Sequence, residues 1–168
     1  MAAVPPPHPA AAFVVASLTA DAQRGDVERR VLVRSEGLIA ELEASDIVVV
    51  STPMHNFAAP SALKAWIDYV VRPGRTFGVT PAGKVGLLIG RPILAIVACG
   101  GRFDAGGPGQ PQVDCLGPYL CYVFGIVGLA NFELLRLEQL RRGSEAVARS
   151  LAAALAWIEM QRARLAPD

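Results

Sequence analysis

The stretch from Ile47 to Phe77, IVVVSTPMHNFAAPSALKAWIDYVVRPGRTF, carries the strongest structural signal in the chain. It opens with a continuous apolar and β-branched run over residues 47–51, which is typical of a parallel strand buried on both faces. Pro60 suits the first turn of a helix, where a missing N–H has no cost, and apolar residues then recur with helical spacing from Leu63. The stretch therefore predicts a strand, a polar loop and a helix that ends before Pro73-Gly74.

Two further apolar runs predict strands, over residues 93–98 and 132–137. Turn residues at 81–83 indicate a small hairpin between the helix that ends before Pro73-Gly74 and the second predicted strand. Because helical patterns alternate with the apolar runs, the chain predicts an α/β domain with a parallel sheet.

Helical spacing of apolar residues predicts three more helices, over about 26–45, over about 114–125 and from Ser144 onward. Ser144 is the expected N-cap of the last helix, because its hydroxyl can accept a backbone N–H bond. The expected buried stripe of this helix consists of Val147, Leu151, Leu155 and Ile158.

Composition excludes several classes of function. A chain of 168 residues fits a single domain over residues 1–168. The formal net charge is +1 and no basic run is present, so the signature of a nucleic-acid-binding protein is absent. No apolar stretch approaches the roughly 20 residues that a membrane span needs. The two histidines cannot build a zinc site by themselves, and no metal site is predicted.

The three cysteines have neither metal-like nor disulfide-like spacing, which indicates reduced thiols in a cytoplasmic protein. Cys115 and Cys121 are expected to be packing residues of a helix. Residues 1–25 lack the basic start of a secretory signal and are expected to form an irregular or partly ordered segment.

Two unusual loops follow consecutive predicted strands, Met54–Phe57 after the first and Ala98–Gly101 after the second. Parallel α/β sheets bind ligands just outside the carboxyl ends of their strands. If the two strands are neighbours, the two loops flank one crevice.

The motifs P-M-H-N-F at 53–57, P-S-x-L-K-A-W-I-D at 60–68, R-x-G-R-T-F at 72–77 and G-G at 100–101 resemble those of a known family. This is the family of FMN-dependent NADH:quinone oxidoreductases and azoreductases, which are flavodoxin-like homodimers that reduce quinones and azo dyes. The resemblance implies a flavodoxin-like three-layer α/β/α fold with a parallel sheet, a homodimer, and NADH or NADPH as co-substrate.

The resemblance also implies a set of FMN-binding residues. Met54, His55, Asn56 and Phe57 would lie along the flavin ring, and the second loop would touch its other side through Ala98, Cys99, Gly100 and Gly101. Backbone N–H groups and an Asn amide can bond to the N/O edge of the flavin, and Gly permits close approach to a flat ring. The flavin would carry the hydride, so no dedicated acid or base is required.

The chain departs from the family at its start, because the match begins after the usual N-terminal phosphate-binding unit. We therefore expect an N-terminally shortened fold in which FMN loses its phosphate cradle. An alternative makes residues 11–17 the first strand and 18–26 a degenerate phosphate loop. The first interpretation leaves the strand at 47–51 as an exposed hydrophobic edge, which the N-terminal segment, a second copy or another protein must cover.

Three site positions differ from the family pattern: His55 replaces Tyr, Cys99 replaces Arg, and Val79 replaces an aromatic residue. His55 and Cys99 could therefore form a catalytic pair of imidazole and thiol. The alternative for Cys99 is a small buried hydrophobe, and for His55 a surface residue.

Three functions remain open from the sequence. The first is an FMN-dependent NAD(P)H oxidoreductase acting on a small aromatic or quinone-like substrate. The second is a flavin-independent enzyme for isomerisation, cyclisation, dehydration or hydrolysis that uses His55 and Cys99. The third is a shortened, non-catalytic partner subunit.

Overall fold

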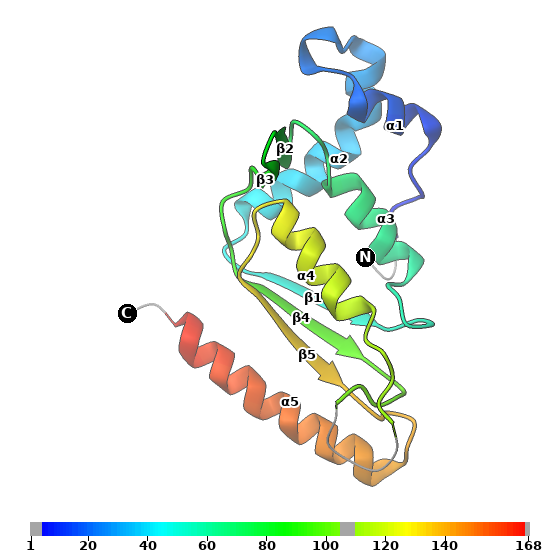
Figure 1. The fold of residues 1–168 in the computed structure, drawn as a ribbon, viewed down its shortest axis with the longest axis vertical. Helices are drawn as coiled ribbons and strands as arrows, with labels where there is room; N and C mark the ends of the chain where they lie inside the picture. Colours follow the sequence, from blue (N-terminus) through cyan, green and yellow to red (C-terminus); the bar gives the residue numbers. More distant parts are fainter. Residues whose placement is uncertain (1–4, 105–109, 167–168) are drawn as a thin grey trace.

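A three-stranded parallel sheet forms the centre of the molecule in this computed structural model, which describes residues 5–104 and 110–166 (Figure 1). Its strands are β1 (Val48–Pro53), β4 (Ile93–Ala98) and β5 (Phe132–Leu137), in the order β1-β4-β5. The registers start at Val48↔Ile93 and Ile93↔Phe132, so all three strands end at one edge. The sequence predicted the bounds of the last two strands correctly.

Helices cover the two faces of this sheet unequally. The helices α2 (Asp26–Ala44), α3 (Ser61–Val70) and α4 (Leu116–Ile126) pack on one face, and α5 (Ser144–Leu165) lies on the other (Figure 1). The predicted α/β/α arrangement is confirmed. One helix alone occupies the second face in the part of the chain that the structure describes.

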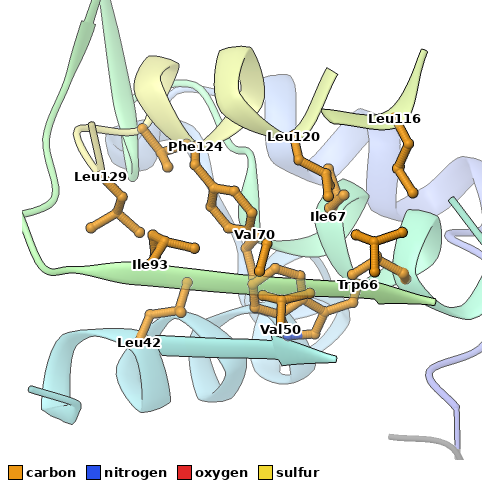
Figure 2. Packing of buried hydrophobic residues seen from close by; sticks show 14 of the residues in the cluster. Leu42, Val50, Trp66, Ile67, Val70, Ile93, Leu116, Leu120, Phe124 and Leu129 are labelled. Atoms are coloured by element: carbon orange, nitrogen blue, oxygen red, sulfur yellow. The ribbon is translucent and has the colours of Figure 1, made fainter. Parts of the chain in front are cut away.

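The hydrophobic core lies between the sheet and the three-helix face (Figure 2). Alternate β4 residues Ile93, Ala95 and Val97 point into it and are almost completely buried, as the period of two in a strand requires. Trp66 of α3 and Phe124 of α4 meet above them with ring centroids 6.3 Å apart. The apolar spacing that predicted these helices is therefore the spacing of residues that build the core.

Arg72 joins α2 to the end of α3 from a buried position, with only 1% of its surface exposed. Its guanidinium donates to Glu36 at 2.6 Å and to the Ser35 hydroxyl at 3.0 Å, both on α2. Arg75 extends the pairing from the same loop, with contacts to Glu36 at 2.9 Å and to Glu43 at 2.7 Å. This network fixes the segment between α3 and the following hairpin.

The predicted hairpin is formed by β2 (Phe77–Thr80) and β3 (Gly83–Gly86), which pair antiparallel. A Cβ atom on Gly86 would lie 2.2 Å from the backbone nitrogen of Gly128. Glycine therefore lets the hairpin approach the connection between α4 and β5.

The N-terminal segment is more regular than the expectation for residues 1–25. It contains the helix α1 (Ala11–Leu18) and a 3₁₀ turn (Asp21–Gln23), so the alternative interpretation of residues 11–17 as a strand is wrong. The helix forms because Phe13 packs edge-on against Tyr69 of α3, with ring centroids 4.8 Å apart, in a small cluster that includes Leu32. Residues 1–4 lie outside the described part of the chain.

Two expectations for the last helix are wrong. Gly143, at φ 96°, occupies the N-cap of α5 in place of Ser144, because the chain turns sharply there before the helix begins. The expected stripe is largely uncovered: Leu151, Leu155 and Ile158 are all exposed. The buried α5 residues are Ala146, Ala154 and Gln161, since only one side of the helix faces β5.

The strand β1 is an edge strand, as expected, and it pairs only with β4 among the described residues. Ile47 and Val49 are exposed there. The N-terminal segment does not cover this edge, because α1 packs on α2 and α3.

Candidate functional site

The carboxyl ends of β1 and β4 lie side by side and bring the two predicted loops together. Pro53 is in register with Ala98, and the backbone N–H of Met54 donates to the carbonyl of Ala98 at 2.9 Å. The polar loop after β1 and the glycine loop after β4 therefore begin at neighbouring points, as parallel pairing requires.

A tight turn presents Asn56 and Phe57 at the end of β1. His55 and Ala58 exchange backbone hydrogen bonds of 3.0 and 2.9 Å, and the two central residues have φ values of 46° and 68°. Positive φ at both central positions defines a type I′ turn, which tolerates Asn well. Holding Phe57 in this region costs about 1 to 2 kcal/mol. Strain of this kind is concentrated at functional sites.

The glycine loop after β4 is fixed by backbone bonds to the segment after β5. Cys99 donates to the carbonyl of Leu137 at 2.8 Å, and Gln139 donates to the carbonyl of Gly101 at 2.8 Å. A Cβ atom on Gly101 would lie 1.9 Å from Oε1 of Gln112, so only glycine permits this approach without displacing that side chain.

The two loops enclose a cavity of about 440 Å³ together with residues from the following segments. Its apolar walls come from Met54, Phe57 and Phe103, while guanidinium and amide groups border it elsewhere. The lining residues are Met54, Asn56, Phe57, Cys99, Gly100, Gly101, Phe103, Gln112, Arg141 and Arg142.

Six of the eight predicted binding residues line this cavity, and His55 and Ala98 do not. The His55 side chain is exposed, and its backbone closes the turn. Arg141 and Arg142 were not predicted. They follow the third parallel strand, so the rule that pointed to the loops after the first two strands would also have found them. Residues 105–109 of the glycine-rich loop lie outside the described residues.

The Cys99 thiol is buried and donates to the carbonyl of Val97, with a sulfur-to-oxygen distance of 3.7 Å. Burial, with the nearby negative charge of Glu138, raises the pKa of the Cys99 thiol to about 11. The thiol is therefore neutral at physiological pH, whereas nucleophilic cysteines need a lowered pKa. The structure thus favours the interpretation of Cys99 as a small buried hydrophobe.

A network of charged side chains holds the site loops in place. Asp114 accepts the N–H groups of Leu116 and Gly117 at the start of α4, at 3.0 and 2.9 Å, and it pairs with Arg136 at 2.8 Å. Acidic residues are favoured at this end of a helix because the helix dipole is positive there.

The same network continues along β5 to the loop after β4. Arg136 contacts Glu138 at 3.2 Å, and the Glu138 carboxylate accepts the N–H groups of Phe103 and Asp104 at 2.7 and 3.2 Å. Sequence reasoning missed these residues because their carboxylates and guanidinium come from segments that only the fold brings together.

A second, more apolar cavity of about 370 Å³ adjoins the turn on its other side and shares Phe57 with the first. The start of α4 contributes Cys115 and Tyr119, and α3 contributes Lys64. Burial raises the pKa of the Tyr119 hydroxyl, which therefore stays protonated. The prediction that Cys115 and Cys121 are packing residues is wrong, since both are exposed, Cys115 at the edge of this cavity.

Residues 2–161 match the family described as having a flavodoxin-like fold. The chain belongs to this family. The resemblance noted from the motifs around Met54–Phe57 and Gly100-Gly101 is confirmed. No group of three or more potential metal ligands occurs within residues 5–104 and 110–166, and no helix in that part is long and apolar enough to cross a membrane.

Named relatives share much of the sequence. The chain is 57% identical over 157 residues to FMN-dependent NADH:quinone oxidoreductase 2 of Cupriavidus pinatubonensis, a match that covers 94% of this chain and 75% of the relative. It is 53% identical over 104 residues to FMN-dependent NADH:quinone oxidoreductase 5 of Burkholderia lata, covering 62% and 50%.

A solved structure shows the same fold. The FMN-dependent NADH-azoreductase of Bacillus anthracis, determined in complex with FMN, superimposes with a TM-score of 0.77 at 27% identity. That match covers 96% of this chain and 76% of the azoreductase chain. As in the Cupriavidus match, about a quarter of the relative's length has no counterpart here.

Proposed function

We propose that this protein is an FMN-dependent NADH:quinone oxidoreductase, which passes a hydride through flavin to a small quinone-like or azo acceptor. The observation that carries the proposal is the single cavity that joins the Asn56-Phe57 turn to the Gly100-Gly101 loop. It occurs in a chain that is 57% identical over 157 residues to an enzyme with that name.

The cavity residues suit the flavin ring. Gly100 and Gly101 present bare backbone on one side, and Met54, Phe57 and Phe103 provide apolar contact for a flat ring. The amide of Asn56, on the strained turn, can donate to and accept from the ring's polar edge. When bound, FMN supplies the hydride chemistry, and the protein supplies position and electrostatics.

Arg141 and Arg142 are the groups at the cavity that suit the phosphate of FMN. A guanidinium can pair with phosphate oxygens through two parallel hydrogen bonds, which gives both affinity and orientation. Both residues border the cavity on the side of the segment after β5.

The apolar cavity beside Phe57 is the proposed position for the aromatic acceptor. Its lining is largely hydrocarbon, and the protonated Tyr119 hydroxyl and the Lys64 ammonium, which also pairs with Asp68, are polar donors at its edge. Such donors can bind the carbonyl oxygen of a quinone and stabilise negative charge that develops there. Phe57 borders both cavities, and backbone hydrogen bonds between His55 and Ala58 fix the turn that carries it.

The proposal includes a cytoplasmic homodimer with the two copies paired across this cavity. Phe57 supports the pairing because it leaves 48% of its surface exposed at the rim of both cavities. Three free thiols suit a reducing compartment. The flavin-independent alternative has less support, since Cys99 is buried and neutral and His55 does not line the cavity.

Titration of FMN with the purified protein tests the cofactor assignment through quenching of flavin fluorescence. We expect micromolar binding, and transfer of electrons from NADH to a naphthoquinone by the loaded protein. Asn56→Gly keeps the positive φ and removes the amide, so FMN affinity should fall about tenfold, the equivalent of one hydrogen bond.

Asn131→Gly is the matched control, because it removes the chain's other asparagine, which lies at the opposite end of β5. FMN affinity should not change in that variant. If the natural protein leaves FMN fluorescence unchanged, the proposed function is wrong. If it binds FMN but Asn56→Gly binds equally well, the flavin lies outside the cavity assigned to it.

A further inference from the structure

A continuous chain of ion pairs and hydrogen bonds connects the two cavities of the candidate site. One end lies at the quinone cavity, which is the apolar cavity proposed for the quinone and is lined in part by Leu116. There Oδ1 of Asp114 accepts the N–H groups of Leu116 and Gly117 at the start of α4. The other oxygen of Asp114 accepts from Nη1 of Arg136 at 2.8 Å. The position of Arg136 on β5 is thus linked directly to the wall of the quinone cavity.

The other end of the chain lies at the FMN cavity, which is lined in part by Phe103. Nε of Arg136 donates to Oε1 of Glu138 at 3.2 Å. Oε2 of Glu138 accepts the N–H groups of Phe103 and Asp104 at 2.7 and 3.2 Å. One guanidinium therefore connects the start of α4 to the Phe103 wall of the FMN cavity.

The two carboxylates depend on the guanidinium that they share. The side chains of Asp114 and Glu138 are only 18% and 15% exposed, and that of Arg136 is 31% exposed. Hydrogen bonds between charged groups are stronger than those between neutral groups, so Arg136 holds both carboxylates in defined positions. Without the guanidinium the two negative charges would repel each other, and both ends of the chain would move.

We propose that Arg136 is a positioning residue that couples the two cavities, so that filling one of them raises the affinity of the other. The inference rests on the proposed function and adds a form of regulation at the same site. A quinone that orders the start of α4 also orders the Phe103 wall through Arg136, so FMN then binds to a wall that is already ordered. Because coupling between binding sites is reciprocal, FMN must raise the affinity for the quinone by the same factor.

Two other routes could couple the cavities without Arg136. Phe57 borders both cavities, and FMN and the quinone could also contact each other directly. Substitution of Arg136 separates these routes from the charged chain, because the turn that carries Phe57 is closed by backbone hydrogen bonds between His55 and Ala58. Coupling through either of these routes should persist when the guanidinium is removed.

Equilibrium dialysis of FMN against the full chain, with and without a naphthoquinone, measures the coupling. NADH is omitted so that the quinone is not reduced, and a quinone ring that is fully methylated prevents addition of the exposed Cys115 thiol. A saturating concentration of this quinone should lower the Kd of FMN about fivefold in the natural protein. In the reverse titration, FMN should lower the Kd of the quinone by the same factor.

Arg136→Met removes the guanidinium but keeps a long apolar side chain. In this variant the Kd of FMN and the KM for the quinone should each rise about tenfold, and the coupling factor should fall to one. The value of kcat should change little, since Arg136 lines neither cavity. Arg136→Lys should recover part of both affinities but little of the coupling, because an ammonium lacks the planar fork that holds two carboxylates at once.

Substitutions at the two ends of the chain should affect different constants. Asp114→Asn should raise the KM for the quinone more than the Kd of FMN, and Glu138→Gln should do the reverse. Arg164→Met is the matched control. Arg164 approaches Glu133, at the opposite end of β5, at 4.0 Å, and its side chain is 38% exposed, close to the value for Arg136. This variant should keep both affinities and the coupling factor.

A coupling factor of one in the natural protein would overturn the proposal. Coupling that persists in Arg136→Met would also overturn it and would assign the effect to one of the other two routes. If Arg136→Met does not fold, the variants at Asp114 and Glu138 decide, since equal effects of both on the two constants contradict the proposal. Failure of the natural protein to bind FMN without quinone would overturn the proposed function as well, whereas binding of FMN without coupling overturns this inference alone.

Discussion

The two faces of the central sheet are built from alternate residues of the same strands but differ in how they are covered. Ile93, Ala95 and Val97 of β4 face α2, α3 and α4 and are almost completely buried. Leu94 and Ile96, their neighbours in sequence, face an apolar groove beside α5. The strand is apolar at every position, as strands covered on both faces are.

The strands are apolar on both faces of the sheet, so their sequences predict that other elements cover both faces. In the described fold, helices cover one face fully and the other only in part. Helix α5 carries the apolar spacing of a packed helix, yet only the side that faces β5 is buried. The open part of this face is therefore lined by apolar side chains, and polar sequence does not account for its exposure.

The largest expected contrast between the faces comes from a pair of leucine truncations. Leu120 on α4 is 0% exposed in the core, and its replacement by alanine should lower the free energy of unfolding by about 2 to 5 kcal/mol. Leu155→Ala on α5 should change it by no more than about 0.5 kcal/mol. Urea denaturation of both variants measures the difference.

The two variants remove the same atoms from helices on opposite faces, so helix propensity cancels between them. A cost above about 2 kcal/mol for Leu155→Ala would show that α5 is covered in solution. In that case the comparison between the faces would fail.

A smaller contrast is expected between the ion pairs of the two faces. Glu36 binds the buried guanidinium of Arg72, whereas Glu159 on α5 pairs with Arg162 at 3.3 Å in an exposed position. Glu36→Gln should cost about 1 to 3 kcal/mol, because it weakens the pairing of a buried charge that already has two unpartnered nitrogens. Glu159→Gln is the matched control and should be nearly neutral.

The Glu36 pair also predicts a pH dependence. Burial raises the pKa of the Glu36 carboxyl, but hydrogen bonds and charge from Arg72 and Arg75 outweigh burial and hold it below its usual value. The stabilisation is therefore present above the usual carboxyl pKa and is lost as the pH falls through the lowered value. Glu36→Gln should flatten this part of the stability profile, and an unchanged slope would contradict the assignment.

Local patterns predicted most of the fold. The bounds of β4 and β5, the start of α2 and the hairpin were correct because apolar periodicity and turn residues act over a few neighbours. The errors lie where tertiary contacts decide. Phe13 orders the N-terminal helix through Tyr69, which lies more than 50 positions away in sequence. The α5 stripe was assigned to the core because periodicity does not reveal whether a partner is present.

In the candidate site, too, local patterns predicted some residues, and tertiary contacts decided the others. The two loops were predicted from their place after consecutive strands, and Asn56 and Phe57 do line the cavity. The network of Asp114, Arg136 and Glu138 could not be predicted, because it joins the start of α4 and the end of β5 to the loop after β4. The burial of Cys99 was one of two open alternatives, since a strand end can face either the core or solvent.

The smallest expected effect concerns the thiols, and it tests how completely the packed face excludes solvent. Cys99 belongs to the core cluster of that face, whereas Cys115 and Cys121 are exposed. With its pKa raised to about 11, the Cys99 thiol has a thiolate fraction near pH 8 roughly a hundredfold below that of an ordinary cysteine.

Iodoacetamide should therefore label Cys115 and Cys121 first, and mass-spectrometric mapping over time should show Cys99 last. Because folding disfavours the Cys99 thiolate, the stability of the protein should also decline as the pH rises from the usual thiol pKa towards 11. Cys99→Ala should remove that decline while FMN binding persists, since the neutral thiol contributes packing and no charge. Labelling of Cys99 as fast as Cys121 would mean that the face we describe as closed opens at the end of β4.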